Sequence, residues 1–164
     1  MVLKNPLTFA KNNGVVMKLG VLKEPEGETR VAIVPTSLKK LQKAGFEVVI
    51  ESGAGVAANY HDAEYEAAGA TVGSRNDALA CETIITIRFP GVEGMKEGTN
   101  LACVSDPFRN PQFVKDCLAS NITLLSMDMI PRRLSRAQSM DVNSSQDNLA
   151  GYKAVLLGAA HVPQ

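Results

Sequence analysis

The composition is that of an ordinary globular domain and excludes several classes of function. The chain has 164 residues, of which 45% are hydrophobic and 21% charged, and a chain of this size can fold around its own apolar core. Its 17 basic and 17 acidic residues cancel and are interspersed, so no field of one sign favours nucleic acid or an anionic membrane. The cysteines are widely spaced in apolar segments, which indicates buried thiols rather than disulfides or a metal site: Cys81, Cys103 and Cys117.

Predicted strands and helices begin after a short amino-terminal extension. Residues 1–16 carry a proline and an Asn-Asn-Gly turn but no apolar targeting core, so we interpret them as a flexible extension and assign residues 17–164 to one domain. The first strand is predicted at residues 18–22. An amphipathic helix then opens at Pro35 and ends at Gly45, with leucines on one face and lysines on the other.

The same alternation continues along the chain. A second strand is predicted at residues 47–51, and a helix follows with Asp62 as its N-cap and Gly69 at its end. Asn110-Pro111 starts another helix, with proline at its first position. The remaining predicted strands are residues 83–87, 101–104 and 122–126. The alternation predicts an α/β fold with three layers and a mainly parallel sheet, Rossmann-like or flavodoxin-like.

The last segment, Ser144 to His161, is predicted to be the longest helix. Its apolar residues recur at mixed helical spacing, which is typical of a helix buried over much of its surface. No partner for that surface is evident in the sequence, so a dimerisation or binding module that pairs through this helix is one interpretation of the chain.

A glycine-rich turn after the second strand matches the G-x-G-x-x-A form of a dinucleotide fingerprint at residues 53–58. Such a fingerprint must lead directly into a helix whose amides face the pyrophosphate. Here three residues separate it from the helix start expected at Asp62. Asp77, near the position of the ribose-binding acid, is instead typical of a helix start. We therefore interpret residues 53–58 as a turn and not as a phosphate site.

Two polar stretches are candidate ligand sites. Arg30 follows the first strand, at the sheet edge where open α/β folds bind ligands, and its guanidinium can hold a carboxylate with two hydrogen bonds. The connection from Pro131 to Asp141 carries three arginines, a glutamine and a carboxylate, which suit an amide-bearing ring with neighbouring phosphates. A solvated loop, with Ser144 capping the last helix, explains that composition equally well.

The sequence resembles the alanine dehydrogenase and transhydrogenase family across nearly its whole length, from Met17 to His161. The resemblance is carried by three stretches, at residues 19–35, 45–55 and 135–152. The third, Arg-Ala-Gln-Ser-Met-Asp followed by Ser-Ser and Ala-Gly-Tyr, is similar to domain I of proton-translocating NAD(P) transhydrogenases in particular. The resemblance implies hydride transfer between NADH at this domain and NADP on another domain, with no metal.

The resemblance also implies roles for individual residues. Gln138, Asp141 and an upstream arginine would form the loop beside the nicotinamide ring. Ser144 would hydrogen-bond the nicotinamide carboxamide, and the nearby Tyr152 is assigned to the same cofactor-binding group. This chain is one residue longer than the family pattern before Ser135, so the ring-facing arginine is either Arg133, which its distance to Gln138 favours, or Arg132.

The alanine dehydrogenase branch of the family is the alternative. There an arginine, a lysine and a histidine hold the substrate carboxylate. Arg30 matches the arginine, but Arg88 stands at the lysine position and Asp106 at the histidine position. An arginine at the lysine position does not readily accept a proton. Arg30 and Arg88 therefore stand at positions like those of the substrate site without completing it. Alanine oxidation is therefore the second interpretation.

Family members continue into a dinucleotide-binding Rossmann domain that this sequence lacks. We expect the chain to be a fragment, a split gene product or a recombinant piece, inactive alone because a nicotinamide loop contacts only one end of NAD. Its expected partners are the NAD-binding Rossmann domain and the NADP-binding domain of the same enzyme, and a second copy in a homodimer. It would be a soluble domain on the cytoplasmic or mitochondrial matrix side of a membrane enzyme, touching the membrane only through the rest of that enzyme.

Overall fold

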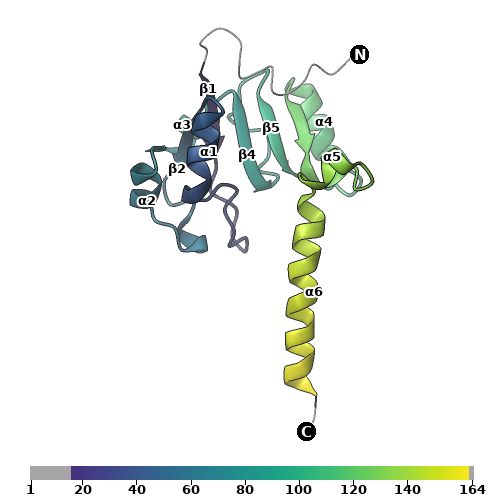
Figure 1. Cartoon of the computed structure of the whole chain (residues 1–164). Coiled ribbons are helices and arrows are strands. Elements are labelled where there is room, and N and C mark those ends of the chain that lie inside the picture. The colour runs from purple at the N-terminus through teal and green to yellow at the C-terminus, as the bar shows by residue number, and fades with distance from the viewer. Residues whose placement is uncertain (1–15, 163–164) are drawn as a thin grey trace.

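A single parallel sheet organises the chain, as a computed structural model that describes residues 16–162 shows (Figure 1). Neighbouring strands are all parallel, and their order is β3-β2-β1-β4-β5-β6. The strands are β1 Met17–Val21, β2 Phe46–Glu51, β3 Thr71–Gly73, β4 Thr83–Arg88, β5 Asn100–Val104 and β6 Thr123–Ser126. The predicted α/β class with a mainly parallel sheet is confirmed.

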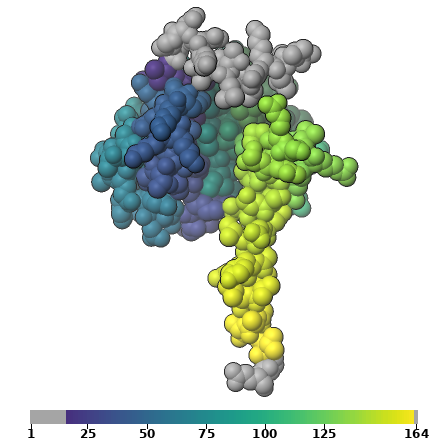
Figure 2. All heavy atoms as spheres, in the orientation of Figure 1, coloured from purple at the N-terminus to yellow at the C-terminus, as the bar shows by residue number. Residues whose placement is uncertain are grey.

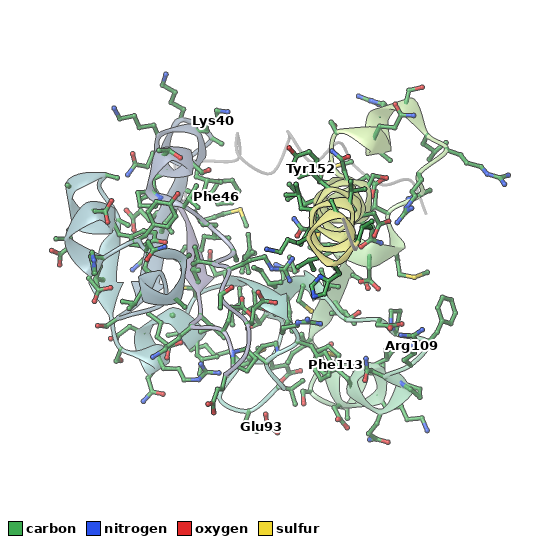
Figure 3. The ribbon with its side chains drawn as sticks, turned by 90° about the horizontal axis from the view of Figure 1, so that it is seen from below. Lys40, Phe46, Glu93, Arg109, Phe113 and Tyr152 are labelled. Atoms are coloured by element: carbon green, nitrogen blue, oxygen red, sulfur yellow. The ribbon has the colours of Figure 1, made fainter. Side chains whose placement is uncertain are left out.

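Helices connect the strands and cover both faces of the sheet. They are α1 Leu38–Lys43, α2 Asp62–Ala67, α3 Arg75–Leu79, α4 Pro111–Ala119, α5 Ser135–Gln138 and α6 Val142–His161. Short 3-10 turns lie at η2 Pro35–Ser37, η3 Val56–Ala58 and η4 Met127–Met129. Figure 3 shows α1, marked by Lys40, on one side of the sheet together with α6, marked by Tyr152, and α4, marked by Phe113, on the other.

Two hydrophobic cores form, one against each face of the sheet. Leu19 and Val21 of β1 point into the first core with Leu38 of α1 and Tyr65 of α2. The second core combines strand residues with α3 and α4: Leu22, Ala78, Leu79, Ile84, Leu101, Cys103, Phe113, Cys117 and Ile122. Alternate residues of a strand face opposite sides of a sheet, so apolar residues at consecutive positions serve both cores. The three-layer architecture follows from this double burial.

The strand order reverses between β1 and β4. Right-handed crossovers put α1 and α2 on one face, and the same handedness puts α3 and α4 on the other. The connection from β4 to β5 also packs on the α4 face, through Val92 and Met95. No crossover helix of residues 16–162 therefore covers β4 and β5 on the α1 face. This reversal is the point at which open α/β sheets bind ligands.

Most elements agree with the sequence-based predictions, and the differences have physical reasons. Strand β3 was not predicted because three strand residues are too short for a periodic signal. The helix start indicated by Asp77 is confirmed, since Asp77 lies in the first turn of α3. The prediction that Asp62 is the N-cap of α2 was wrong by one residue. His61 holds that position, and its backbone N–H donates to the carboxylate of Glu64 at 2.9 Å. The predicted extension lies outside the described residues except for Val16.

The backbone of the glycine-rich turn binds a carboxylate of this chain, that of Asp62. The backbone N–H of Gly53 donates to the Asp62 carboxylate at 2.9 Å, and the Ser52 hydroxyl donates to it at 2.7 Å. The Ser52 hydroxyl and then the Gly53 amide lower the pKa of Asp62. The chain next enters η3 rather than a helix that could face a phosphate. The interpretation of residues 53–58 as a turn is confirmed.

Helix α6 projects from the body as a long stalk (Figure 2). The predicted terminal helix is confirmed, and it begins at Val142, two residues before Ser144. The expectation that much of its surface is buried was wrong for this chain, since every described residue after Asn143 is exposed. Its apolar side chains include Leu149, Tyr152, Val155, Leu156 and Leu157. None of the helices within residues 16–162 has the length and hydropathy needed to cross a bilayer.

Gly20 of β1 provides a test of the sheet packing. A Cβ atom there would run into the backbone carbonyl of Ala78 in α3. We expect Gly20→Ala to lower the free energy of unfolding by about 1–3 kcal/mol, because a buried backbone cannot yield to the added methyl group. Chemical denaturation measures this.

Gly151 is the matched control, since a Cβ at that helical position meets nothing within 4 Å. Gly151→Ala should leave stability unchanged or raise it slightly, because alanine favours the helix. Equal losses for the two variants would contradict the packing described here.

Candidate functional site

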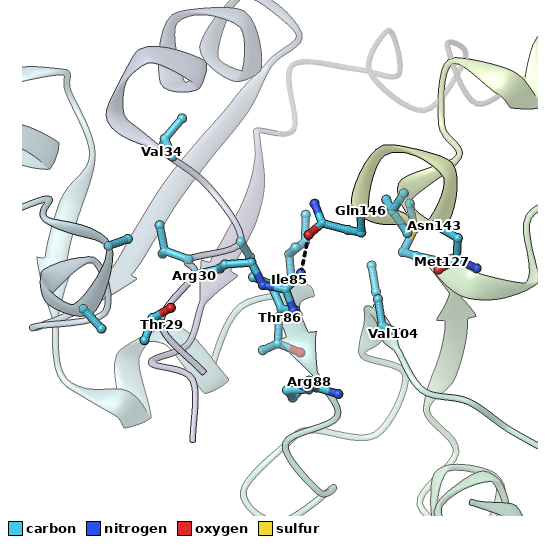
Figure 4. A pocket seen from close by; sticks show the side chains of 17 residues that line it. Thr29, Arg30, Val34, Ile85, Thr86, Arg88, Val104, Met127, Asn143 and Gln146 are labelled. Carbon is cyan, nitrogen blue, oxygen red and sulfur yellow. Dashed lines mark hydrogen bonds between the residues drawn. The ribbon is translucent and has the colours of Figure 1, made fainter. Parts of the chain in front are cut away.

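A cleft of about 810 Å³ lies at the carboxyl edge of the sheet, between the loop after β1 and the ends of β4 and β5. Figure 4 shows it between the loop after β1 and the beginning of α6. It is lined by Thr29, Arg30, Val31, Ala32, Val34, Ala57, Ala58, Ile85, Thr86, Ile87, Arg88, Ala102, Val104, Met127, Val142, Asn143 and Gln146. Its volume and its mostly apolar lining suit a small organic ligand.

Three segments far apart in sequence form the cleft. The last residues of β4 and β5 make its floor, residues 29–34 make one wall, and the first turns of α6 make the other. The α1 face of β4 and β5 is available because the crossovers change sides at β1. Residues 29–34 stay on the sheet because Val31 and Ile33 are buried in the core.

An ion-pair network dominates the polar side of the cleft. The guanidinium of Arg30 donates to both carboxylate oxygens of Glu28, from Nε to Oε1 and from Nη2 to Oε2, each at 2.7 Å. Its Nη1 donates to Oε1 of Gln146 on α6 at 2.7 Å. Arg88 Nε adds a third donor to Glu28, at 3.2 Å. The side chain of Glu28 is only 8% exposed, so two arginines share one nearly buried carboxylate.

Glu24 ties the loop after β1 to the end of β4. Its carboxylate accepts hydrogen bonds from the backbone N–H groups of Ile87 at 2.6 Å and Arg88 at 2.9 Å. Burial raises the pKa of Glu24, and the two backbone donors oppose that rise. The carboxylate thus takes the place of a neighbouring strand at the end of β4 and fixes the backbone there.

Thr86 offers an unsatisfied polar atom at the cleft. The residue is 5% exposed, and its Oγ1 is buried without a hydrogen-bond partner in the structure. Within residues 16–162 it is the only buried side-chain polar atom in that state. Because an unpaired buried hydroxyl is costly, it is a natural contact for a ligand in the cleft that Thr86 lines.

The loop that we assigned to the nicotinamide lies beside the cleft, at the start of α6. Asp141 is the N-cap of this helix, with its carboxylate accepting the backbone N–H of Ser144 at 3.1 Å as well as the Ser144 hydroxyl. These bonds, the hydroxyl first, lower the pKa of Asp141. The alternative in which Ser144 itself caps the helix was therefore wrong. Gln138 ends the short helix α5, within a connection that we had expected to be a loop, and it is exposed.

The two candidate arginines differ in their contacts. Arg132 reaches Oδ2 of Asp147 at 3.2 Å and Oδ2 of Asp141 at 3.8 Å. Arg133 is exposed, and none of the ion pairs or hydrogen bonds found among residues 16–162 involves its side chain. Arg132 therefore pairs with carboxylates of α6 and of its N-cap. The guanidinium of Arg133 makes no such pair among the described residues.

The structure places the candidate residues in two groups. Arg30 and Arg88 line the cleft. None of the others lines the cleft; they lie between residues 132 and 152, in the connection before α6 and on that helix: Arg132, Arg133, Gln138, Asp141, Ser144 and Tyr152. Asp141 directly precedes Val142, the first residue of α6 that lines the cleft. The ligand-binding roles of both groups stay predictions.

Sequence reasoning missed three polar residues that line the cleft, namely Thr86, Asn143 and Gln146. It also missed Glu24 and Glu28, which bind the lining residues Arg30, Ile87 and Arg88. Glu28 precedes Arg30 by two residues, and a strand-end pair of this kind was a usable signal. Thr86 lies inside an apolar strand, and Gln146 follows a helix start, so neither stands out by spacing. Residues 16–162 contain no group of three His, Cys, Asp or Glu side chains placed to hold a metal.

The Glu28 network predicts a pH-dependent contribution to stability. Hydrogen bonds from Arg30 lower the pKa of Glu28 from 4.5 to about 2. The folded-state pKa lies below the unfolded one, so the contribution is present above pH 4.5 and is lost as pH falls toward about 2. Partial exposure of the arginines limits it to about 1–2 kcal/mol. We expect Glu28→Gln to lose this amount above pH 4.5 and to converge with the parent protein near pH 2, as measured by denaturation.

Glu26→Gln is the control for this comparison, since Glu26 is an exposed neighbour in the same loop. It should follow the parent protein at every pH. A constant gap between Glu28→Gln and the parent protein would contradict the role assigned to the charge of Glu28.

Comparison with known proteins gives consistent relatives. The family described as "Alanine dehydrogenase/PNT, N-terminal domain" matches residues 20–150. An NAD(P) transhydrogenase subunit alpha polypeptide of Rhodospirillum rubrum is 44% identical over 154 residues, which is 87% of this chain and 40% of that protein. The solved structure of a transhydrogenase from Sinorhizobium meliloti is similar with a TM-score of 0.84 and 39% identity, over 90% of this chain and 45% of that one.

A solved L-alanine dehydrogenase is also similar, with a TM-score of 0.67 and 27% identity, over 74% of this chain and 34% of that one. The chain thus spans less than half the length of these relatives. The fold, the cleft at the strand reversal and the match over residues 20–150 agree. This chain belongs to the alanine dehydrogenase and NAD(P) transhydrogenase family and corresponds to its N-terminal domain.

Proposed function

We propose that this chain is the N-terminal portion of the NAD(H)-binding component of a proton-translocating NAD(P) transhydrogenase, and that it forms the wall of the site next to the nicotinamide. One observation carries the proposal. The stretch Ser135 to Asp141 ends at the N-cap of α6, and the first turns of that helix line an open cleft at the carboxyl edge of the sheet. The likeness to transhydrogenase alpha subunits supports it.

The chemistry of the site suits positioning rather than acid–base catalysis. Hydride transfer needs the two nicotinamide rings about 3–3.5 Å apart and aligned. The hydride step itself involves no proton transfer to or from a side chain. Gln138 can donate to and accept from a carboxamide, and the exposed guanidinium of Arg133 can reach a phosphate or a ring substituent. Asp141 would set the position of this loop, because its carboxylate is bonded to the first turn of α6.

The residues present fit one end of a dinucleotide. The cleft of about 810 Å³ can take a ring with its ribose, and Thr86 holds an unpaired hydroxyl there. The glycine turn does not suit a pyrophosphate, because the Asp62 carboxylate already occupies the amide of Gly53. When bound, NADH supplies the hydride, and this chain orients the ring that carries it.

The proposal assigns partners to the rest of the enzyme. A Rossmann domain would hold the pyrophosphate and adenosine of NAD(H), and a further domain would hold NADP(H). The exposed apolar side chains of α6, such as Leu149 and Tyr152, would pack against those domains or against a second copy in a homodimer. The chain alone would not transfer hydride. It would act on the cytoplasmic or mitochondrial matrix side of the membrane, which it would meet only through the parent enzyme.

Asp141 and Gln138 give the kinetic test. The chain is joined to the remaining portion of the Rhodospirillum rubrum relative, and transfer from NADH to an NADP analogue is measured with the NADP-binding partner present. We expect Asp141→Asn and Gln138→Leu each to lower kcat by about 10²-fold, since a small misplacement of the ring has that effect. Asparagine caps a helix as well as aspartate does, so Asp141→Asn should keep its thermal stability.

Gln112→Leu is the matched control, because Gln112 lies on α4 and bonds only Asp116 among the described residues. It should keep full activity. Unchanged kcat in both Asp141→Asn and Gln138→Leu would refute the proposed role of the loop.

Binding of a small carboxylate, as in the alanine dehydrogenase branch, is the second candidate. It is favoured by two arginines and a free hydroxyl on one cleft, namely Arg30, Arg88 and Thr86. Against it, Glu28 already neutralises one of the two guanidiniums. Asp106, at the position of the substrate-binding histidine, also does not suit a small carboxylate. Its backbone N–H donates to Asp128 at 3.0 Å, and its carboxylate pairs with Arg109 at 3.6 Å.

The same chimeric enzyme separates the two candidates. We expect no NADH oxidation on addition of pyruvate and ammonia, because neither arginine readily exchanges a proton at neutral pH. Transfer to the NADP analogue should continue under the same conditions. Pyruvate-dependent oxidation of NADH that is lost in Arg30→Gln would instead establish the alanine dehydrogenase function.

A further inference from the structure

Helix α6 is held to the body only near its beginning, as far as residues 16–162 show. Asn143 donates to the backbone carbonyl of Asp128 at 3.2 Å, and Arg132 pairs with Asp147 at 3.2 Å. The third contact joins Arg30 to Gln146 at 2.7 Å. The pair with Asp147 and the bond to Gln146 both involve exposed side chains, so exposure does not distinguish them.

The Arg30–Gln146 contact differs from the other two in the part of the chain that it joins to α6. Asp128 and Arg132 belong to the segment just before α6, so they fix the helix only to its own chain neighbourhood. Arg30 lies across the cleft, in the loop after β1 (Figure 4). A helix that is attached on both sides of the cleft has a fixed direction. If α6 were attached only to the segment before it, the helix could swing about that attachment.

The guanidinium of Arg30 is oriented by Glu28. A guanidinium is planar, and two of its nitrogens are taken by Glu28 in a bidentate pair. Glu28 also binds Arg88, whose backbone N–H is held by Glu24. A continuous chain of polar contacts therefore runs from Gln146 on α6 to the end of β4. Because the guanidinium is planar, the pair with Glu28 also fixes the position of Nη1, which donates to Gln146.

We infer that Arg30 and Gln146 form a latch that fixes the direction of α6 across the cleft, so that Arg30 is a positioning residue. The helix has 20 residues, which makes a lever about 30 Å long. A tilt of about 10° at the base moves its far end by about 5 Å. If the proposed function holds, the latch sets where the following dinucleotide-binding part stands relative to the nicotinamide loop.

The test measures the direction of α6 in this chain without nucleotide, so its outcome is independent of the kinetic test above. Spin labels are attached through Lys40→Cys on α1 and Ala154→Cys on α6, both exposed positions. The native thiols Cys81, Cys103 and Cys117 are buried, and the parent protein without added cysteines checks that they stay unlabelled. Pulsed electron resonance then gives the distribution of distances between the labels.

We expect a narrow distribution for the parent pair and one roughly twofold broader for Gln146→Leu, because only the attachments on one side of the cleft remain. Gln146→Glu should keep the narrow distribution at low salt and broaden at high salt, since its carboxylate replaces a neutral contact with Arg30 by an ion pair. Asn148→Leu, an exposed substitution on the same helix, should match the parent pair. Circular dichroism checks that each variant keeps its helix content.

The latch is overturned if Gln146→Leu gives the parent width. It is also overturned if Gln146→Glu broadens as much as Gln146→Leu at low salt, or if Asn148→Leu broadens equally. Each of these results would mean that the direction of α6 does not depend on the bond to Arg30.

Discussion

The handedness of the crossovers is the constraint on which the site depends. Right-handed connections must change faces when the strand order reverses, and here they do so between β1 and β4. As a result α1 and α2 cover one face of the sheet, and α3 and α4 cover the other face. The α1 face of β4 and β5 receives no crossover helix within the described residues, and the cleft lies there. Its floor is made of the ends of β4 and β5.

The carboxylates next to this cleft are already hydrogen-bonded by other groups of the chain. Glu24 accepts two backbone amides and Glu28 accepts two guanidiniums. Such buried carboxylates stabilise the fold only while their donors are present, since an unpaired buried charge is costly. Thr86 is the exception, a buried hydroxyl without a partner. The site thus combines a preformed polar frame with one open hydrogen-bonding position, which favours orientation of a ligand over strong binding by this chain alone.

Helix α6 belongs to the cleft at its beginning and leaves the folded body over the rest of its length. Its first turns belong to the cleft, whereas the rest of its length is exposed and largely apolar. Both cores are closed without it. The relatives are more than twice as long as the stretch they share with this chain, and the grip on the remaining part of a dinucleotide is proposed to come from such a portion. The loop that is proposed to contact the nicotinamide ends at Asp141, where the exposed helix leaves the folded body.

The sequence by itself determined most of the elements and the α/β architecture. Apolar runs such as Val48 to Ile50 and helix signals such as Asn110-Pro111 are local, and alternation of strand and helix leaves few topologies. It also indicated Arg30 and the stretch that ends at Asp141, because strand ends and polar turns can be recognised from spacing. Only the tertiary structure brought Gln146 to Arg30, across 116 positions of sequence, and left Thr86 without a partner. These relations depend on which strands become neighbours and on which side a helix leaves the sheet, and neither is encoded in local spacing.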